Sequence, residues 1–221
     1  MSKWFIVPLR INEIFYSIQG ESLYAGLPCV FIRLTGCNLR CAYCDTRYAY
    51  HEGADMTIPE ILRKIASYPA TALVEITGGE PLFQEATPNL VRQLLDHGRR
   101  VLMETNGSLD ISRIDTRCIR IMDIKCPSSL MDAHNDPDNL RRIGPNDQIK
   151  FVIETQADYV YALNILKQLP PDFPGSSILF SPAFGFLSPS LLAKWVLQDG
   201  LGVRLHLQLH KLIWPNTERG V

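Results

Sequence analysis

The sequence has no run of about 18 apolar residues, so it predicts no membrane-spanning helix and no membrane partner. It also lacks an excess of basic residues, because 22 Lys and Arg stand against 23 Asp and Glu for a formal net charge of −1. This balance leaves no basic surface to grip a nucleic-acid backbone, and we expect no nucleic-acid partner. The N-terminal segment lacks an apolar signal core with a small-residue cleavage site, which indicates a cytoplasmic location.

A disulfide scaffold is not expected either. The chain has 6 cysteines among 221 residues, and three of them are crowded into positions 37–44. That crowding indicates metal or redox chemistry. Hydrophobic residues make up 46% and charged residues 20%, as is typical of a folded globular chain. The length suits a single domain over residues 1–221.

Apolar β-type runs alternate with segments of helical periodicity along most of the chain. Helical spacing occurs at 58–65, 90–95 and 160–166, with Thr57 as the expected N-cap of the first segment and Gly98 as the stop of the second. This alternation predicts an α/β fold in which helices pack outside a parallel sheet. The number of strands does not decide between a closed barrel and a partly open one. We expect strands at 30–34, 73–77, 101–104, 119–124, 149–153, 178–180 and 203–207.

Polar motifs follow these expected strands. The carboxyl ends of parallel strands meet at one edge of the sheet, where α/β folds build their active sites. The sequence therefore predicts one site that gathers residues from many strands. One segment, 128–147, has no clear periodicity and is either a functional excursion or a surface loop. The motifs are the cysteines at 37–44, Thr77-Gly78-Gly79-Glu80-Pro81, Glu104-Thr105-Asn106-Gly107, Asp123-Ile124-Lys125, Ser181-Pro182 and Gln208-Leu209-His210-Lys211.

The cysteine loop has the spacing C-x3-C-x2-C, formed by Cys37, Cys41 and Cys44. Three thiolates on a short loop can hold one iron–sulfur cluster, and a [4Fe-4S] cube bound by three ligands keeps one iron open for chemistry. The main alternative is a non-catalytic structural zinc site. Zinc requires a closed tetrahedral set, for which His51 or Cys29 is the available fourth ligand.

The cysteine spacing, the Tyr43-Cys44 pair and the downstream Gly78-Gly79-Glu80-Pro81 together resemble the radical S-adenosylmethionine superfamily. The resemblance implies a [4Fe-4S] cluster and S-adenosylmethionine as cofactors. It also implies that a 5′-deoxyadenosyl radical abstracts hydrogen from the substrate, while the protein supplies binding and orientation.

The likeness is closer than the superfamily. The block at 13–22 (EIFYSIQGES), the segments 25–28 and 31–36, and Cys44-Asp45-Thr46 resemble the 7-carboxy-7-deazaguanine synthase family. That family converts 6-carboxy-5,6,7,8-tetrahydropterin to 7-carboxy-7-deazaguanine with loss of ammonia, in queuosine and deazapurine biosynthesis. The resemblance implies Mg²⁺, an electron donor such as flavodoxin or ferredoxin, a homodimer and a modified, incomplete (β/α) barrel. A glycyl-radical activase shares the three cysteines but would not need the block at 13–22.

Site residues carried over from the family fall into four groups. Arg33 alternates with Phe31 on an expected strand, so both should face one side, and its guanidinium can fork onto the substrate carboxylate; an edge salt bridge is the alternative. Thr46 is the implied magnesium ligand, with a helix cap as its alternative role. The substrate group is Ile18, Gln19, Gly20, Arg33 and Thr77; the S-adenosylmethionine group is Gly79, Glu104, Asn106, Asp123, Lys125 and Ser181; the cluster group is Cys37, Cys41 and Cys44.

Several other residues are expected to be structural. His206 and His210 alternate on the last expected strand, where lone histidines are usually satisfied core groups. Cys29, Cys118 and Cys126 lack cluster spacing and are expected to be small buried residues. Many family members end at a proline whose carboxylate reaches the active site. Here Pro215 is followed by Asn-Thr-Glu-Arg-Gly-Val, which leaves that role open.

Overall fold

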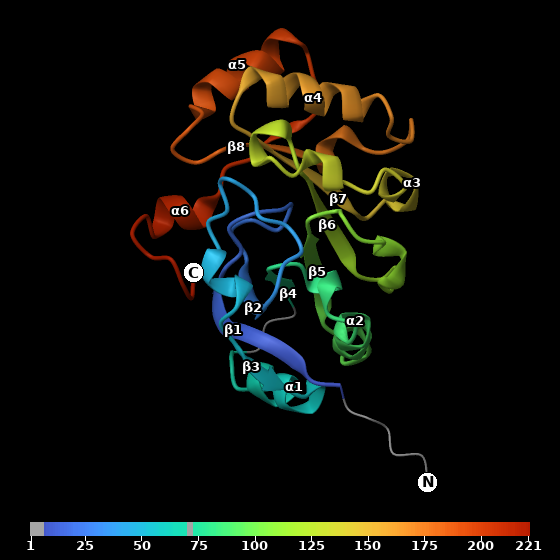
Figure 1. Ribbon diagram of the computed structural model, residues 1–221, viewed down its shortest axis with the longest axis vertical. Helices are drawn as coiled ribbons and strands as arrows, with labels where there is room; N and C mark the ends of the chain where they lie inside the picture. Colours follow the sequence, from blue (N-terminus) through green and yellow to red (C-terminus); the bar gives the residue numbers. More distant parts are fainter. Residues whose placement is uncertain (1–6, 70–72) are drawn as a thin grey trace.

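The computed structural model describes residues 7–69 and 73–221. These residues form a nine-stranded open sheet with the order β3-β1-β2-β4-β5-β6-β7-β8-β9 (Figure 1). From β2 onward each strand is parallel to its neighbour, while β1 is antiparallel to both β2 and β3. The two edge strands, β3 and β9, do not pair with each other in the described sheet. The barrel is therefore incomplete, as the family resemblance implies. The strands are β1 (Leu9–Ile18), β2 (Pro28–Leu34), β3 (Ala54–Met56), β4 (Leu73–Gly78), β5 (Arg100–Thr105), β6 (Ile119–Ile124), β7 (Gln148–Ile153), β8 (Ile178–Pro182) and β9 (Arg204–Leu205).

The sequence pattern identified the parallel strands well but missed β1 and β3. Apolar runs set the boundaries of β2 and β4 to β8 within about two residues, since these strands are buried on both faces. Strand β1 mixes buried and half-exposed positions and lies toward the sheet edge, so it has no continuous apolar run. The expected last strand is shorter than predicted, because β9 covers only Arg204–Leu205.

The helices lie around the outside of the sheet (Figure 1). Thr57 caps α1 as expected, through a capping box in which its N–H donates to Glu60 Oε2 at 2.7 Å. Gly98, at φ +75°, follows the end of α2. Among the described residues, none of the helices is long and apolar enough to cross a bilayer. The helices are α1 (Ile58–Ala66), α2 (Thr87–Asp96), α3 (Asn139–Arg142), α4 (Gln156–Leu166), α5 (Pro189–Gln198) and α6 (Leu209–Ile213).

Alternation along each strand separates the apolar core from the site. Ile32, Ile76 and Met103 are fully buried in the main core cluster, whose other members include residues of α1, α2, α4 and α5. Their neighbours in sequence, Arg33, Thr77 and Glu104, point to the opposite face, since successive side chains of a strand alternate. The same strands that bury the core therefore present a row of polar side chains inside the barrel.

The segment 128–147, which the sequence predicts to be either a functional excursion or a surface loop, supports the site. Ser129 O accepts a hydrogen bond from Ala42 N at 3.0 Å, which joins this segment to the cysteine loop. Asn135 accepts from Lys125 N and donates to Lys125 O, both at 2.9 Å, and so fixes the end of β6. Asn139 donates to the carbonyls of Gly107 and Leu109 after β5. The segment therefore holds three parts of the site in place: the cysteine loop, the end of β6 and the loop after β5.

Candidate active site

A cavity of about 230 Å³ opens at the carboxyl ends of the strands, where the sequence placed the site. Ser181 does not line it: this residue is fully buried in β8, although Ala183 and Phe184 just beyond it do line the cavity. All other site residues expected from the sequence line it, namely Ile18, Gln19, Gly20, Arg33, Cys37, Cys41, Cys44, Thr46, Thr77, Gly79, Glu104, Asn106, Asp123 and Lys125.

The cysteine loop follows β2, and its three thiols are free, half-buried and directed to the same cavity. Two N–H groups already face Cys37 Sγ: Leu39 N at 3.4 Å and Asn106 Nδ2 at 3.8 Å. Hydrogen bonds to the sulfurs are one of the ways in which proteins tune iron–sulfur clusters. On the outer side, Arg40 Nη1 donates to the carbonyls of Cys37 and Leu39, both at 2.7 Å, which holds the loop in its curve.

The described residues offer no closed set of ligands for a single zinc ion. Among residues 7–69 and 73–221, no three cysteine, histidine or acidic side chains gather closely enough to hold one metal ion. Structural zinc needs a closed tetrahedral set, whereas a cluster with one open iron needs only the three cysteines as protein ligands. Cys29, considered as a fourth zinc ligand, is buried within β2, and His51 is exposed. Cys118 and Cys126 are buried, as expected.

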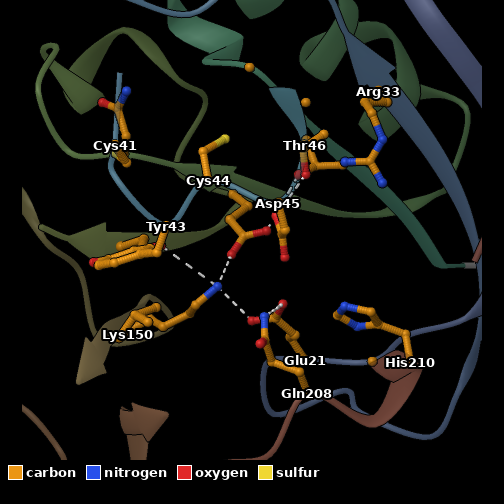
Figure 2. A pocket seen from close by; sticks show the side chains of 18 of the residues that line it. Glu21, Arg33, Cys41, Tyr43, Cys44, Asp45, Thr46, Lys150, Gln208 and His210 are labelled. Atoms are coloured by element: carbon orange, nitrogen blue, oxygen red, sulfur yellow. Dashed lines mark hydrogen bonds and ion pairs between the residues drawn. The ribbon is translucent and has the colours of Figure 1, made fainter. Parts of the chain in front are cut away.

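Lys150 is the centre of the site's charge network, and the sequence analysis missed it. Its Nζ lies 2.5 Å from Glu21 Oε2, 2.5 Å from Glu104 Oε1 and 3.7 Å from Asp123 Oδ2, with only 5% of the side chain exposed (Figure 2). Burial opposes ionisation of Glu21, but the charge of Lys150 prevails and lowers the pKa of that carboxyl. The missed signal was a single lysine inside the otherwise apolar run 149–153, since a buried charge needs partners.

Two buried polar atoms of cavity-lining residues, Asp123 Oδ1 and Tyr43 OH, have no hydrogen-bond partner among the described residues. The other oxygen of Asp123 binds Lys125 Nζ at 2.8 Å. Buried polar groups are nearly always satisfied, so these atoms indicate a polar ligand beside the cluster. An amino-acid and nucleoside ligand such as S-adenosylmethionine has the donors and acceptors to satisfy them.

Arg33 faces the cavity on the same side as Phe31, as the alternation predicted. Its Nε donates to Glu13 Oε1 at 2.7 Å, and its guanidinium lies 5.6 Å from the ring centre of Phe15 and 5.9 Å from that of Tyr48. No hydrogen bond joins either terminal nitrogen to the described part of the chain. The salt bridge and the ligand-binding role are thus compatible. Glu13 binds only Nε of the guanidinium, so the two terminal nitrogens remain available to a ligand carboxylate.

The Gly-Gly-Glu-Pro turn is held by its glutamate. Glu80 is fully buried and accepts hydrogen bonds from Asn106 N, Leu82 N and Thr105 Oγ1 at 2.7 to 3.0 Å. Gly79 packs against the carbonyl of Gly36, and any Cβ at position 79 would overlap it. The glycine is therefore required by the packing of two site loops, in addition to the contact with S-adenosylmethionine that the family resemblance implies.

The C-terminal region completes the wall of the cavity through α6. Correcting the sequence prediction, His210 lies in this helix and not on the last strand; it lines the cavity and touches Gly20, where a Cβ would overlap its ring. Leu209 N donates to Gly20 O at 2.9 Å, and Gln208 Nε2 donates to Glu21 Oε1 at 2.9 Å. Gly20 thus permits a close approach of α6, and it also lines the cavity.

His206 also differs from the expectation of a satisfied core histidine. It follows β9 and is 6% exposed, and its Nε2 has no hydrogen-bond partner among the described residues. Beyond α6 the chain turns back to the cavity. Gly220 N donates to Glu13 Oε2 at 3.2 Å, Arg219 pairs with Glu52 at 2.8 Å, and Val221 lines the cavity. The segment after Pro215 therefore contacts the same Glu13 that anchors Arg33.

Comparisons with known proteins identify the family of this chain. Residues 31–165 match the family model described as the radical SAM superfamily. The chain is 47% identical to the 7-carboxy-7-deazaguanine synthase of Chlorobaculum tepidum, covering 97% of this chain and 98% of that protein. It is 42% identical to the 7-carboxy-7-deazaguanine synthase of Koribacter versatilis, covering 96% and 100%.

A solved structure agrees as well. The crystal structure of QueE from Escherichia coli superimposes with a TM-score of 0.75 at 25% identity, covering 92% of this chain and 95% of that one. The match to the family model and the identity to full-length relatives are both high enough to assign the family. This chain belongs to the radical SAM superfamily and, within it, to the family of 7-carboxy-7-deazaguanine synthases.

Proposed function

We propose that the cavity binds the cluster, S-adenosylmethionine and 6-carboxy-5,6,7,8-tetrahydropterin side by side and carries out the family's ring contraction to 7-carboxy-7-deazaguanine. One observation carries this proposal: three free thiols and the open edge of an arginine fork line the same cavity of about 230 Å³. A site of this kind can hold a metal cluster and an organic carboxylate together. Figure 2 shows Arg33, Thr46 and Cys41 among the residues that line this cavity.

The cofactor side of the cavity is formed by the cysteine loop and the ends of β4 to β6. When bound, the [4Fe-4S] cluster and S-adenosylmethionine supply the radical that removes a hydrogen atom from the substrate. We assign Cys37, Cys41 and Cys44 to the cluster. Asp123 is the best supported ligand for S-adenosylmethionine, because its Oδ1 is buried and unpartnered among the described residues. The remaining members of this group are Gly79, Glu104, Asn106, Lys125 and Ser181, of which Asn106 already donates to Asn38 Oδ1 at 3.1 Å.

The substrate side lies between β1, β2 and β4. Arg33 binds the pterin carboxylate with its two terminal nitrogens, while Gln19, Thr77 and the backbone around Ile18 and Gly20 face the ring. Arg33 is held in place before substrate arrives, since Glu13 fixes its Nε. Preorganisation of this kind reduces the side-chain entropy that binding would otherwise cost.

Replacing Arg33 with alanine should therefore weaken the use of substrate far more than the binding of S-adenosylmethionine. We expect kcat/KM for the pterin to fall by about 100-fold or more, because a charge-assisted fork contributes on the order of 3 kcal/mol. Steady-state kinetics would measure the fall, and equilibrium binding of S-adenosylmethionine to the same variant provides the control. Equal losses of both would indicate misfolding and contradict the assignment.

A magnesium site at Thr46 is also part of the proposal. Thr46 stands before the 3-10 turn Arg47–Tyr50 but makes no side-chain cap, and its Oγ1 lines the cavity and donates to Asp45 Oδ1 at 2.9 Å. Asp45 in turn pairs with Lys211. Magnesium keeps several waters and takes few protein ligands, so one hydroxyl and an oxygen of the substrate suffice.

Accordingly, Thr46→Ala should raise the Mg²⁺ concentration that half-saturates turnover, by about tenfold if one of the few protein ligands is lost. A magnesium titration of initial rates on wild type and variant would measure this shift. Thr57→Ala, which removes a hydroxyl at the remote N-cap of α1, is the matched control. An unchanged magnesium dependence in Thr46→Ala would remove the residue from the metal site.

An electron donor, a homodimer and a single domain over 1–221 complete the proposal. Arg40 and Arg47 are exposed on the outer side of the cysteine loop, where a small acidic donor such as flavodoxin or ferredoxin would come near the cluster.

The described cysteines are all free thiols, which suits work in a reducing cytoplasm. Sedimentation of the reconstituted protein would test the dimer.

The decisive experiment is an anaerobic turnover assay of reconstituted protein with S-adenosylmethionine, a reductant, Mg²⁺ and 6-carboxy-tetrahydropterin, read by mass spectrometry. We expect 7-carboxy-7-deazaguanine and ammonia. Slow release of 5′-deoxyadenosine alone would leave the radical chemistry standing and require another substrate. Absence of both from protein with a verified four-iron cluster would overturn the proposal.

A further inference from the structure

Glu75 is a buried carboxyl on the cavity wall that none of the roles above uses. It lies in β4, is 4% exposed and lines the cavity. It faces the same side of β4 as Thr77, one step deeper into the barrel, because residues i and i+2 of a strand share a face. In register it stands beside Phe31 of β2 and Leu102 of β5, which are both apolar. The acid is thus the polar member of an otherwise apolar layer.

No cation pairs with Glu75 within the described part of the chain. Lys150 pairs instead with Glu21, Glu104 and Asp123. The partner of Glu75 is Gln19, whose side-chain amide donates to Glu75 Oε2 while its own Oε1 accepts from Glu21 N at 2.8 Å. Burial, reinforced by Glu104 and Glu21, raises the pKa of Glu75 well above its ordinary value. A carboxyl group has more acceptor sites than one amide donor can fill, so Glu75 can also accept a hydrogen bond from an N–H group of a ligand.

The position of Glu75 relative to Arg33 defines which part of a ligand it would meet. Arg33 is in register with Thr77, so Glu75 is one strand across and two residues deeper, roughly 8 Å away between Cα atoms. A pterin that places its 6-carboxylate on Arg33 and its ring toward the barrel floor directs its far end to this layer. That end carries the exocyclic 2-amino group, which is a hydrogen-bond donor.

We propose that Glu75 is a specificity-determining residue, which accepts a hydrogen bond from the 2-amino group of the pterin while Arg33 holds the carboxylate at the opposite end. The inference rests on the proposed function and adds the feature of the substrate that the barrel floor recognises. A carboxyl oxygen accepts this bond in either protonation state of Glu75. A ring system without the amino group leaves the buried acid facing an apolar carbon, and a site built around a hydrogen bond rejects such an analogue.

The test pairs two substrates with several enzymes. The substrates are 6-carboxy-tetrahydropterin and its 2-deamino analogue, which carries hydrogen at C2. The enzymes are wild type, Glu75→Met, Glu75→Gln and the control Glu85→Leu, which removes an exposed carboxyl outside the cavity. We expect removal of the amino group to lower wild-type kcat/KM by about 10- to 100-fold, mainly through KM, because the contact is made in both ground and transition states. Glu85→Leu should behave as wild type does.

Glu75→Met should lose activity with the full pterin but discriminate between the substrates by no more than about threefold, because the acceptor is gone. Glu75→Gln, which keeps an acceptor oxygen, should recover part of the discrimination. If Glu75 only supports Gln19, both substrates would suffer equally in Glu75→Met and its discrimination would match that of wild type, which overturns the inference. Equal kcat/KM values of the wild-type enzyme for the two substrates would also overturn the inference, and this result does not depend on whether a variant folds. Failure of the proposed function is distinct, since wild type would then not turn over the full pterin.

Discussion

Replacing Cys41 with alanine should abolish the cluster-dependent cleavage of S-adenosylmethionine. Cys41 is the middle thiol of a loop whose three free cysteines all face one cavity. Two thiolates leave a second iron of the cube without a protein ligand, so the cluster is no longer retained in its catalytic form. We expect iron and sulfide content to fall well below four per chain after reconstitution, and release of 5′-deoxyadenosine to fall to background.

Cys118 provides a matched control for this experiment. It is also a free cysteine, is 1% exposed and lies just before β6, at the amino end of the strand and away from the site. Cys118→Ala should reconstitute a full cluster and retain turnover. Retention of cluster and activity by Cys41→Ala would be incompatible with the cluster assignment, and loss of the cluster by both variants would reveal only a general sensitivity of the fold.

Replacing Lys150 with methionine should destabilise the protein by about 3–5 kcal/mol, since removal of one member of a buried ion network leaves charges uncompensated. Lys150 is 5% exposed and lies 2.5 Å from both Glu21 and Glu104. Methionine fills a similar volume without charge, which isolates the electrostatic effect. For a chain of this size we expect a fall in Tm of about 10 °C. Turnover should fall as well, because Glu104 and Asp123 lose the cation that positions them.

Thermal unfolding of the reconstituted protein under anaerobic conditions would measure the effect. Lys167→Met is the control, because Lys167 is exposed and its ammonium contacts only Asn164 Oδ1, at 3.1 Å, in the described chain. Its Tm should change by less than about 1 °C, as for most surface substitutions. Equal Tm values for Lys150→Met and the control would mean that the three carboxylates do not depend on Lys150.

Much of the fold was accessible from the sequence because its signals are local. Strands β4 to β8 are buried on both faces, so each is a short, mostly apolar segment, and polar motifs follow β4, β5, β6 and β8. The cap of α1 by Thr57 and the stop after α2 at Gly98 depend on a few consecutive residues. By contrast, β1 and β3 pair across the sheet edge, and their sequences have no apolar run that marks them as strands.

The sequence by itself also indicated the family and many of the residues that line the cavity. The cysteine spacing and the block at 13–22 are contiguous, and the rule that parallel strands end at one edge brings Arg33, Thr77, Glu104 and Asp123 together without coordinates. These inferences need only the order of residues along the chain and the period of a strand.

Only the tertiary structure decided which of these side chains meet. Lys150 finds Glu21, which is distant in sequence, because β7 faces the loop after β1 across the barrel. Glu13 accepts hydrogen bonds from both Arg33 Nε and Gly220 N. Helix α6, near the end of the chain, contacts Gly20 through Leu209 N. Glu75 could be identified as an acid without a cation only once the partners of Lys150 were known. Pairings of this kind depend on strand register, barrel curvature and the path of the terminal segment. These follow from packing over the whole molecule and leave no periodic trace in any one stretch of sequence.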